Sequence, residues 1–309
     1  MMTIWKHDQG KLIETETITQ DCWVHVTAPD QEEVRMLSEM FPVDIDTLND
    51  ILDVDEQSRI EREDEWLLLI IRVPVFNANE EVPYYTVPLG VILYDDILIT
   101  ISVCENPILK DFIQGKIRNL SLANKYSFVL HIFMRSAFYF LRYLKDINRK
   151  TSIVEKDLQQ SVKNNELIQL LTFEKCLVYF TTSLKSNELL MEKMRKPQLM
   201  RFKETEMDFL EDCLTENEQA IEMANIYSNI LSGMMDAFAS VISNNLNVVM
   251  KRLTTISIIL MIPTLIASWY GMNVHLPFMA SRFAFGGIML SSVALSVVVA
   301  LIFRKQKFF

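Results

Sequence analysis

The sequence predicts an α+β protein: an N-terminal α/β domain, then long helices, then two membrane-spanning helices near the C-terminus. Strand-like apolar runs separated by turn residues are confined to residues 1–120. Helical periodicity with few helix breakers fills residues 121–252. Residues 253–309 contain two uncharged apolar runs, Leu253 to Tyr270 and Phe283 to Phe303. These observations divide the chain into three predicted parts.

The first part, residues 1–120, alternates strand and helix signals. Residues 22–29 predict a short strand, residues 65–76 a long strand, and residues 84–103 two strands joined at Asp95 and Asp96. Residues 30–41 begin with a capping Asp and carry apolar residues at helical spacing, which predicts a helix. The acid-rich segment 53–64 lacks the glycine and ligand spacing of a calcium loop. We interpret that segment as a solvated connector.

The second part, residues 121–252, is predicted to be helical throughout. Its last helix starts near residue 203, meets no proline until Pro263 inside the first apolar run, and ends near residue 270. At 1.5 Å per residue, such a helix is roughly 100 Å long. No globular monomer needs a helix of that length, so we expect it to pack against copies of itself.

The third part, residues 253–309, predicts a transmembrane hairpin in a lipid bilayer. Each apolar run has about the length that a helix needs to cross the hydrocarbon core. Basic residues flank the pair on one side, with Lys251 and Arg252 before the first run and Arg304 and Lys305 after the second. Positive flanks stay in the cytoplasm, so we expect both termini there and the connecting loop outside.

Composition excludes several functions. The net charge of −10, from 40 acidic and 30 basic residues, argues against binding of nucleic acid. The sequence carries no phosphate-binding glycine motif and no nucleophile constellation, so we do not expect an enzyme. Its 4 cysteines are far apart and form no metal-binding pair.

A stripe of mostly small and polar residues follows one face of the long helix. Its members recur at steps of alternately four and three and include Asp236, Ser240, Ser243, Asn247, Met250, Thr254, Ser257, Met261, Thr264 and Ser268. Polar groups at membrane depth face a bundle interior or a water-filled path. The alternative is that the Ser and Thr hydroxyls bond only to their own helix or pack between helices. The length of the stripe favours a pore formed by several copies of this helix.

Neutral oxygens along such a pore suit a strongly hydrated cation. Mg2+ sheds its water reluctantly, and neutral oxygens accept hydrogen bonds from its hydration shell without removing it. Met250, Leu253 and Met261 add apolar constrictions that close a pore by excluding water.

The first span ends on Tyr-Gly-Met-Asn, residues 270–273, which follows a Met-x-Pro-Thr and precedes the second span and a basic tail. In this motif and its position the chain resembles the CorA family of magnesium transporters. Residues 232–254 are similar to the stalk helix of the family, and residues 47–61 to the segment before its central strand. The resemblance covers essentially the whole chain.

The resemblance implies a funnel-shaped homopentamer with cytoplasmic α/β domains, a bundle of stalk helices and two membrane helices per subunit. It makes Gly271, Met272 and Asn273 the selectivity filter at the outer mouth. Matching pore-lining positions are Asp236, Asn247, Met250, Leu253, Met261 and Thr264. The family pattern places a constriction at Leu253, whereas the stripe alone selects Thr254.

The resemblance also implies regulation by the transported ion. Asp50 and Asp212 match acids that hold regulatory Mg2+ between neighbouring cytoplasmic domains and keep the pore closed. The expected function is thus a gated passive channel that imports Mg2+, and also Co2+ or Ni2+, across the inner membrane. Two departures leave ion preference open: Asn49 stands where an acid is common, and the loop Val274 to Arg282 contains no acid. A transporter of another divalent ion such as Zn2+, and a membrane-anchored regulatory scaffold without flux, are the alternatives.

Overall fold

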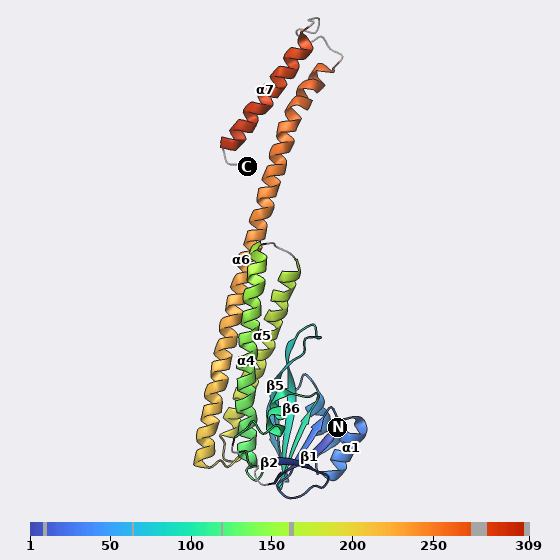
Figure 1. Ribbon diagram of the computed structural model, residues 1–309, viewed down its shortest axis with the longest axis vertical. Helices are drawn as coiled ribbons and strands as arrows, with labels where there is room; N and C mark the ends of the chain where they lie inside the picture. Colours follow the sequence, from blue (N-terminus) through green and yellow to red (C-terminus); the bar gives the residue numbers. More distant parts are fainter. Residues whose placement is uncertain (9–10, 64, 119, 161–163, 273–282, 306–309) are drawn as a thin grey trace. The chain divides into compact units, whose positions relative to one another are not determined.

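The computed structural model describes the whole chain except residues 9–10, 64, 119, 161–163, 273–282 and 306–309 (Figure 1). Its internal contacts group the residues into two compact units, Met1–Met234 and Met235–Phe309. The predicted division into residues 1–120, 121–252 and 253–309 stays a prediction.

The first unit contains a mixed seven-stranded sheet with the strand order β2-β1-β3-β7-β6-β5-β4. Only β3 and β7 pair in parallel among the strands of this sheet, and the other neighbours are antiparallel. The strands are β1 (Met2–Asp8), β2 (Lys11–Thr15), β3 (Trp23–Thr27), β4 (Arg59–Arg62), β5 (Trp66–Phe76), β6 (Tyr84–Tyr94) and β7 (Ile97–Ser102).

Helices cover both faces of the sheet, which explains why β5 is an almost continuous apolar run. On one face, α1 (Gln31–Met40) and α2 (Ile45–Leu52) pack against Leu68 and Ile70 of β5. On the other face, the next residues of the same strand, Leu69 and Ile71, join the core formed with α3 (Pro107–Ile113), α4 (Lys125–Gln160) and α5 (Asn164–Met194). The two cores therefore share one strand through its alternating side chains.

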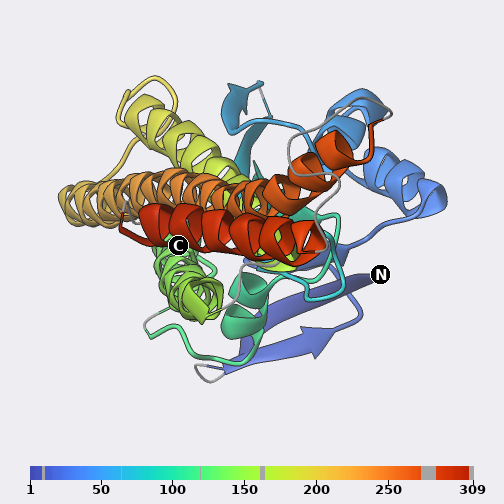
Figure 2. The ribbon, with the colours of Figure 1, turned by 90° about the horizontal axis from the view of Figure 1, so that it is seen from above.

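The longest helix, α6 (Glu204–Tyr270), has 67 residues and belongs to both units. Its first turns pack beside α4 and α5, where the Cys213 thiol donates to the Leu130 carbonyl at 3.4 Å and Asn217 Nδ2 donates to the Leu184 carbonyl at 3.0 Å. The second unit contains the rest of α6 and α7 (Ala284–Lys305), which lies beside it (Figures 1 and 2). Both α6 and α7 contain segments long and apolar enough to cross a membrane.

Most of the predicted elements are confirmed. The strands at β3, β5, β6 and β7, the capped helix α1 and the long helix ending at Tyr270 occur where the pattern predicts them. Asp30 caps α1 by accepting from the Glu33 backbone N–H at 2.8 Å. Asp95, at the turn between β6 and β7, has a positive φ of 42°.

The interpretation of residues 53–64 as a solvated connector is wrong in part. Arg59–Arg62 of this segment forms β4, which pairs with β5 at the edge of the sheet. This strand is short and has a charged residue on each side of Ile60 and at its end, so its sequence lacks the apolar alternation that predicts strands. Edge strands of this composition are common because charges discourage pairing with other chains.

Candidate ion pathway and cytoplasmic carboxylates

The predicted pore stripe is an exposed face of α6 within the single chain. Its side chains project from the part of α6 that belongs to the second unit, Met235–Phe309. All predicted pore-lining residues are exposed: Asp236, Asn247, Met250, Leu253, Thr254, Met261 and Thr264. A face that combines polar groups with exposed methionine and leucine is available for another copy of the helix.

The opposite face of the same helix is covered. Thr255 is 1% exposed, and Ile259, Ile262 and Ile266 are partly buried. At about 100° per residue, the centres of this set and of the stripe lie roughly 140° apart around the helix axis. Since α7 lies beside this part of α6 (Figures 1 and 2), the predicted stripe faces away from α7.

Small polar residues occur where the two helices are covered. Ser292 and Ser296 of α7 are 4% and 9% exposed. Each hydroxyl is satisfied locally, because Thr255 donates to the Lys251 carbonyl at 2.8 Å and Ser296 to the Ser292 carbonyl at 3.0 Å. Small residues of this kind let membrane helices approach closely.

The hydroxyls of the stripe also donate to their own helix. Thr264 Oγ1 donates to the Leu260 carbonyl at 3.1 Å, and Ser257 Oγ donates to the Leu253 carbonyl at 2.9 Å. Bonding of these hydroxyls to their own helix is the alternative to a pore that the sequence left open. It uses only the hydrogen of each hydroxyl, however, and leaves oxygen lone pairs that accept from water. An exposed, back-bonded hydroxyl is therefore an acceptor, which is what the hydration shell of a cation requires.

The helix ends at the predicted filter. The Gly271 N–H donates to the Ala267 carbonyl at 3.0 Å, and the Met272 N–H donates to the Trp269 carbonyl at 3.3 Å. Both residues are exposed. The third predicted filter residue, Asn273, lies outside the described residues, and its role stays a prediction.

The predicted regulatory carboxylate Asp50 lies in the last turn of α2. Asp44 caps the start of this helix by accepting from the Thr47 N–H at 2.7 Å, and the buried Leu48 and Ile51 fix it on the sheet. The helical period then turns Asp50 away from the sheet, and its side chain is 53% exposed. The second predicted carboxylate, Asp212, is exposed on α6 next to the buried Cys213.

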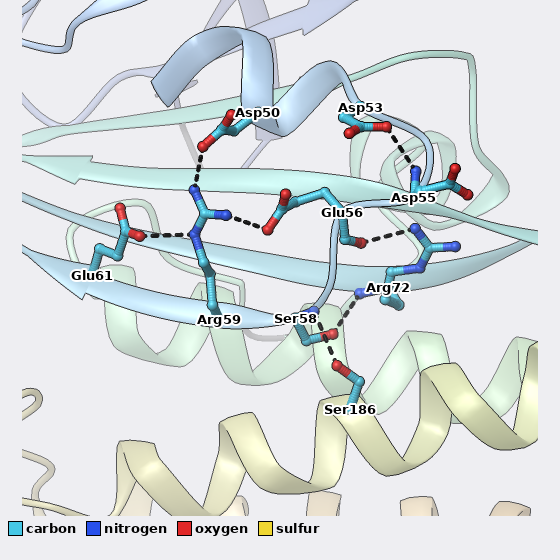
Figure 3. A network of polar contacts seen from close by, with 9 residues as sticks. All are labelled: Asp50, Asp53, Asp55, Glu56, Ser58, Arg59, Glu61, Arg72 and Ser186. Atoms are coloured by element: carbon cyan, nitrogen blue, oxygen red, sulfur yellow. Dashed lines mark hydrogen bonds and ion pairs between the residues drawn. The ribbon is translucent and has the colours of Figure 1, made fainter. Parts of the chain in front are cut away.

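Arg59 of β4 is the residue that the sequence interpretation missed (Figure 3). Its Nη2 lies 2.9 Å from Asp50 Oδ2 and its Nε lies 2.8 Å from Glu61 Oε1, while Nη1 contacts the Glu56 carboxylate. Partial burial lowers the pKa of the guanidinium. The three carboxylates together raise it by more than burial lowers it, so its pKa lies above the ordinary value. The sequence signal was a pair of arginines, Arg59 and Arg62, inside the acid-rich segment 53–64.

Asp50 and Asp212 do not by themselves form a metal site in one chain. Among the described residues, no group of three or more His, Cys, Asp or Glu side chains could hold a metal ion. Mg2+ binds proteins through one or two carboxylates with retained water, so two facing acids are enough for a hydrated ion. Each of these carboxylates is exposed and able to meet a second chain.

A family model described as "CorA-like Mg2+ transporter protein" matches residues 19–305. This chain belongs to the CorA family. Its members are ion transporters and not enzymes, which agrees with the predicted class. Since the match includes both apolar helices, the chain is a two-span membrane protein of that family.

Named relatives and a solved structure support this membership. The cobalt/magnesium transport protein CorA of Methanocaldococcus jannaschii is 26% identical over 92% of this chain and 90% of its own. The protein of the same name from Thermotoga maritima is 21% identical over 92% of this chain and 82% of its own. The complete structure of the M. jannaschii CorA magnesium transporter matches with a TM-score of 0.85 at 23% identity, covering 100% of this chain and 99% of that chain. The CorA fold, with its N-terminal sheet, long helix and C-terminal apolar helix, is thereby confirmed.

Proposed function

We propose that this CorA-family protein is a gated passive channel that imports Mg2+, and also Co2+ or Ni2+, across the inner membrane. The observation that carries the proposal is the free polar face of α6, which lies opposite the face covered beside α7. Copies of α6 placed around one axis with this face inward form a pore lined by acceptor oxygens and apolar constrictions. The relatives named as cobalt/magnesium transport proteins support the same class of ion.

The assembly that we propose is a funnel-shaped homopentamer with cytoplasmic termini. The basic residues before α6 enters its apolar segment and at the end of α7 support this orientation. The membrane potential then drives uptake, since moving one charge inward is favoured by about 2.3 kcal/mol per 100 mV. No chemical energy source is needed for such transport.

Gating is proposed to follow the Mg2+ concentration in the cytoplasm. Asp50 of one subunit and Asp212 of its neighbour are exposed carboxylates, and a hydrated divalent cation bound between them links the two subunits. Filled sites hold the closed assembly, and empty sites release it, because the ion binds the closed state more tightly.

Ion flux tests the proposal. Mg2+ uptake is measured in proteoliposomes with an imposed inside-negative potential, for the parent and for Asn273→Ala. We expect uptake by the parent and its loss in the variant, because Asn273 first holds the hydrated ion. Uptake unchanged by the substitution would mean that another filter operates. Uptake of Zn2+ in preference to Mg2+ would support the alternative of a zinc transporter. No uptake of any divalent ion tested would support the alternative of a membrane-anchored scaffold.

A further inference from the structure

The C-terminal end of α2 concentrates negative charge. Asp50 lies in its last turn, Asp53 caps its end, and Asp55 and Glu56 follow directly (Figure 3). The C-terminus of a helix also carries the negative end of the helix dipole. An exposed carboxylate in this position attracts any available cation.

The chain supplies two cations of its own at this place, and they are used differently. Arg72 of β5 is fixed by neutral acceptors, since its guanidinium donates to the carbonyls of Glu56 and Thr86 at 2.9 Å each. The Arg59 guanidinium instead lies against three carboxylates, those of Asp50, Glu56 and Glu61. Arg72 is thus part of the framework, whereas Arg59 neutralises the acids.

Asp50 is the most exposed of the three carboxylates around Arg59. Its side chain is 53% exposed, against 20% for Glu56 and 41% for Glu61. The Arg59 side chain is 27% exposed and comes from β4, the strand at the edge of the sheet. Asp50 is therefore the carboxylate of this cluster that a cation from solvent reaches most easily. Binding of the cation there requires that it displace Arg59.

We propose that Arg59 is a built-in competitor for the divalent cation at Asp50 and that it sets the Mg2+ concentration at which the cytoplasmic sites fill. The inference rests on the proposed regulatory role of Asp50 and adds the residue that tunes it. While Arg59 holds Asp50, the carboxylate is neutralised without Mg2+. When Mg2+ is abundant, it takes over Asp50, and Arg59 remains paired with Glu56 and Glu61.

The test uses the full-length protein in lipid nanodiscs and limited proteolysis over a range of Mg2+ concentrations at constant ionic strength. The measured quantity is the Mg2+ concentration that gives half-maximal protection. In Arg59→Gln we expect it to fall by about threefold to tenfold, because one charge-assisted contact to Asp50 is lost. Arg62→Gln is the matched control: Arg62 lies on the same strand, carries the same charge and donates to the carbonyls of Gln198 and Leu199 at 3.2 and 2.8 Å. We expect the control to match the parent.

Asp50→Ala separates this inference from the proposed function. If Asp50→Ala loses Mg2+ protection while Arg59→Gln and Arg62→Gln both match the parent, the regulatory site stands and the competitor role is overturned. If Asp50→Ala keeps the protection of the parent, the regulatory site is wrong and the inference falls with it. The inference would also be overturned if Arg59→Gln lowered the Mg2+ concentration for half-maximal protection equally with and without Asp50→Ala. The effect of Arg59 would then not act through Asp50.

A second variant keeps the test decisive if Arg59→Gln does not fold. Glu61→Gln removes one carboxylate that shares Arg59, so Arg59 holds Asp50 more tightly and more Mg2+ is needed for half-maximal protection. Glu63→Gln makes the same charge change two residues further along. We expect an increase only in Glu61→Gln; no increase, or the same increase in both variants, would overturn the inference.

Discussion

Gly90 of β6 lies directly against Ile51 of α2. A Cβ atom added at Gly90 would lie 2.5 Å from Ile51 Cγ2 and 2.9 Å from its Cδ1. The missing side chain lets α2 lie close on the sheet, and α2 carries Asp50 one residue before Ile51. The position of the predicted regulatory carboxylate therefore depends on this glycine.

Gly90→Ala is expected to lower the free energy of unfolding by about 1–3 kcal/mol, because the added methyl overpacks the α2 contact. Denaturant unfolding of the detergent-solubilised protein, followed by tryptophan fluorescence, measures the change. Gly233→Ala is the control, since a Cβ there meets nothing within 4 Å. Gly90→Ala/Ile51→Ala should lose less than the sum of the single changes. If the losses in free energy of unfolding of the two single variants were fully additive in the double variant, the contact between Gly90 and Ile51 would be contradicted.

Asn187 of α5 bonds to the backbone of β5 as a neighbouring strand would. Its Nδ2 donates to the Arg72 carbonyl at 2.8 Å, and its Oδ1 accepts from the Arg72 N–H at 3.0 Å. We expect Asn187→Ala to cost about 2–4 kcal/mol, because the Arg72 carbonyl loses this donor and the Arg72 N–H keeps only its longer bond to Ser58 Oγ at 3.3 Å. The nearby Leu189→Ala, whose side chain is 64% exposed, should change stability by less than about 0.5 kcal/mol. Similar losses of free energy of unfolding in the two variants would show that the hydrogen bonds of Asn187 do not contribute measurably to stability.

The stability of the sheet should fall in mild acid because of His25. Burial, with the N-terminal ammonium group nearby, lowers the pKa of His25 to about 4 from its ordinary 6.5, against a small opposing effect of Glu105. Between these values the unfolded chain binds more protons than the folded one, so stability falls as the pH falls from 6.5 towards 4. The loss from this residue is at most about 3 kcal/mol.

The measurement for His25 is the thermal midpoint of the full-length protein at pH 7 and at pH 4.5. His25→Gln removes the titrating group, and we expect it to show a smaller acid-induced drop than the parent. His7→Gln, at an exposed position, should behave as the parent does. An identical drop in all three proteins would exclude His25 as the cause.

Thiol labelling distinguishes the two faces of α6 in the membrane. In a cysteine-free background, Met261→Cys lies on the exposed stripe and Ile262→Cys on the partly buried face. We expect a water-soluble methanethiosulfonate reagent to reduce Mg2+ uptake at position 261 by more than about tenfold, because a modified side chain obstructs a narrow pore. Position 262 should be much less sensitive. Stronger inhibition at 262 than at 261 would reverse the assigned pore face.

Much of this protein could be predicted from residues that are close together in sequence. The apolar run of β5, the capping Asp30, the uninterrupted helix to Tyr270 and the two apolar spans are local patterns, and each element occurs where its pattern indicates. The stripe on α6 is also a local pattern, because residues three and four apart share a face of any helix. The sequence by itself therefore determined the elements, the membrane spans and the polar face.

Only the tertiary structure decided how these elements use their surfaces. Whether the stripe or the opposite face of α6 lies beside α7 depends on packing between segments that sequence periodicity does not relate. The pairing of Arg59 with Asp50 depends on how β4 adds to the sheet edge and how α2 packs across it, with Gly90 allowing the close approach. The physical reason is that local patterns fix which side of an element is apolar, whereas the partners of a charged side chain follow from long-range packing.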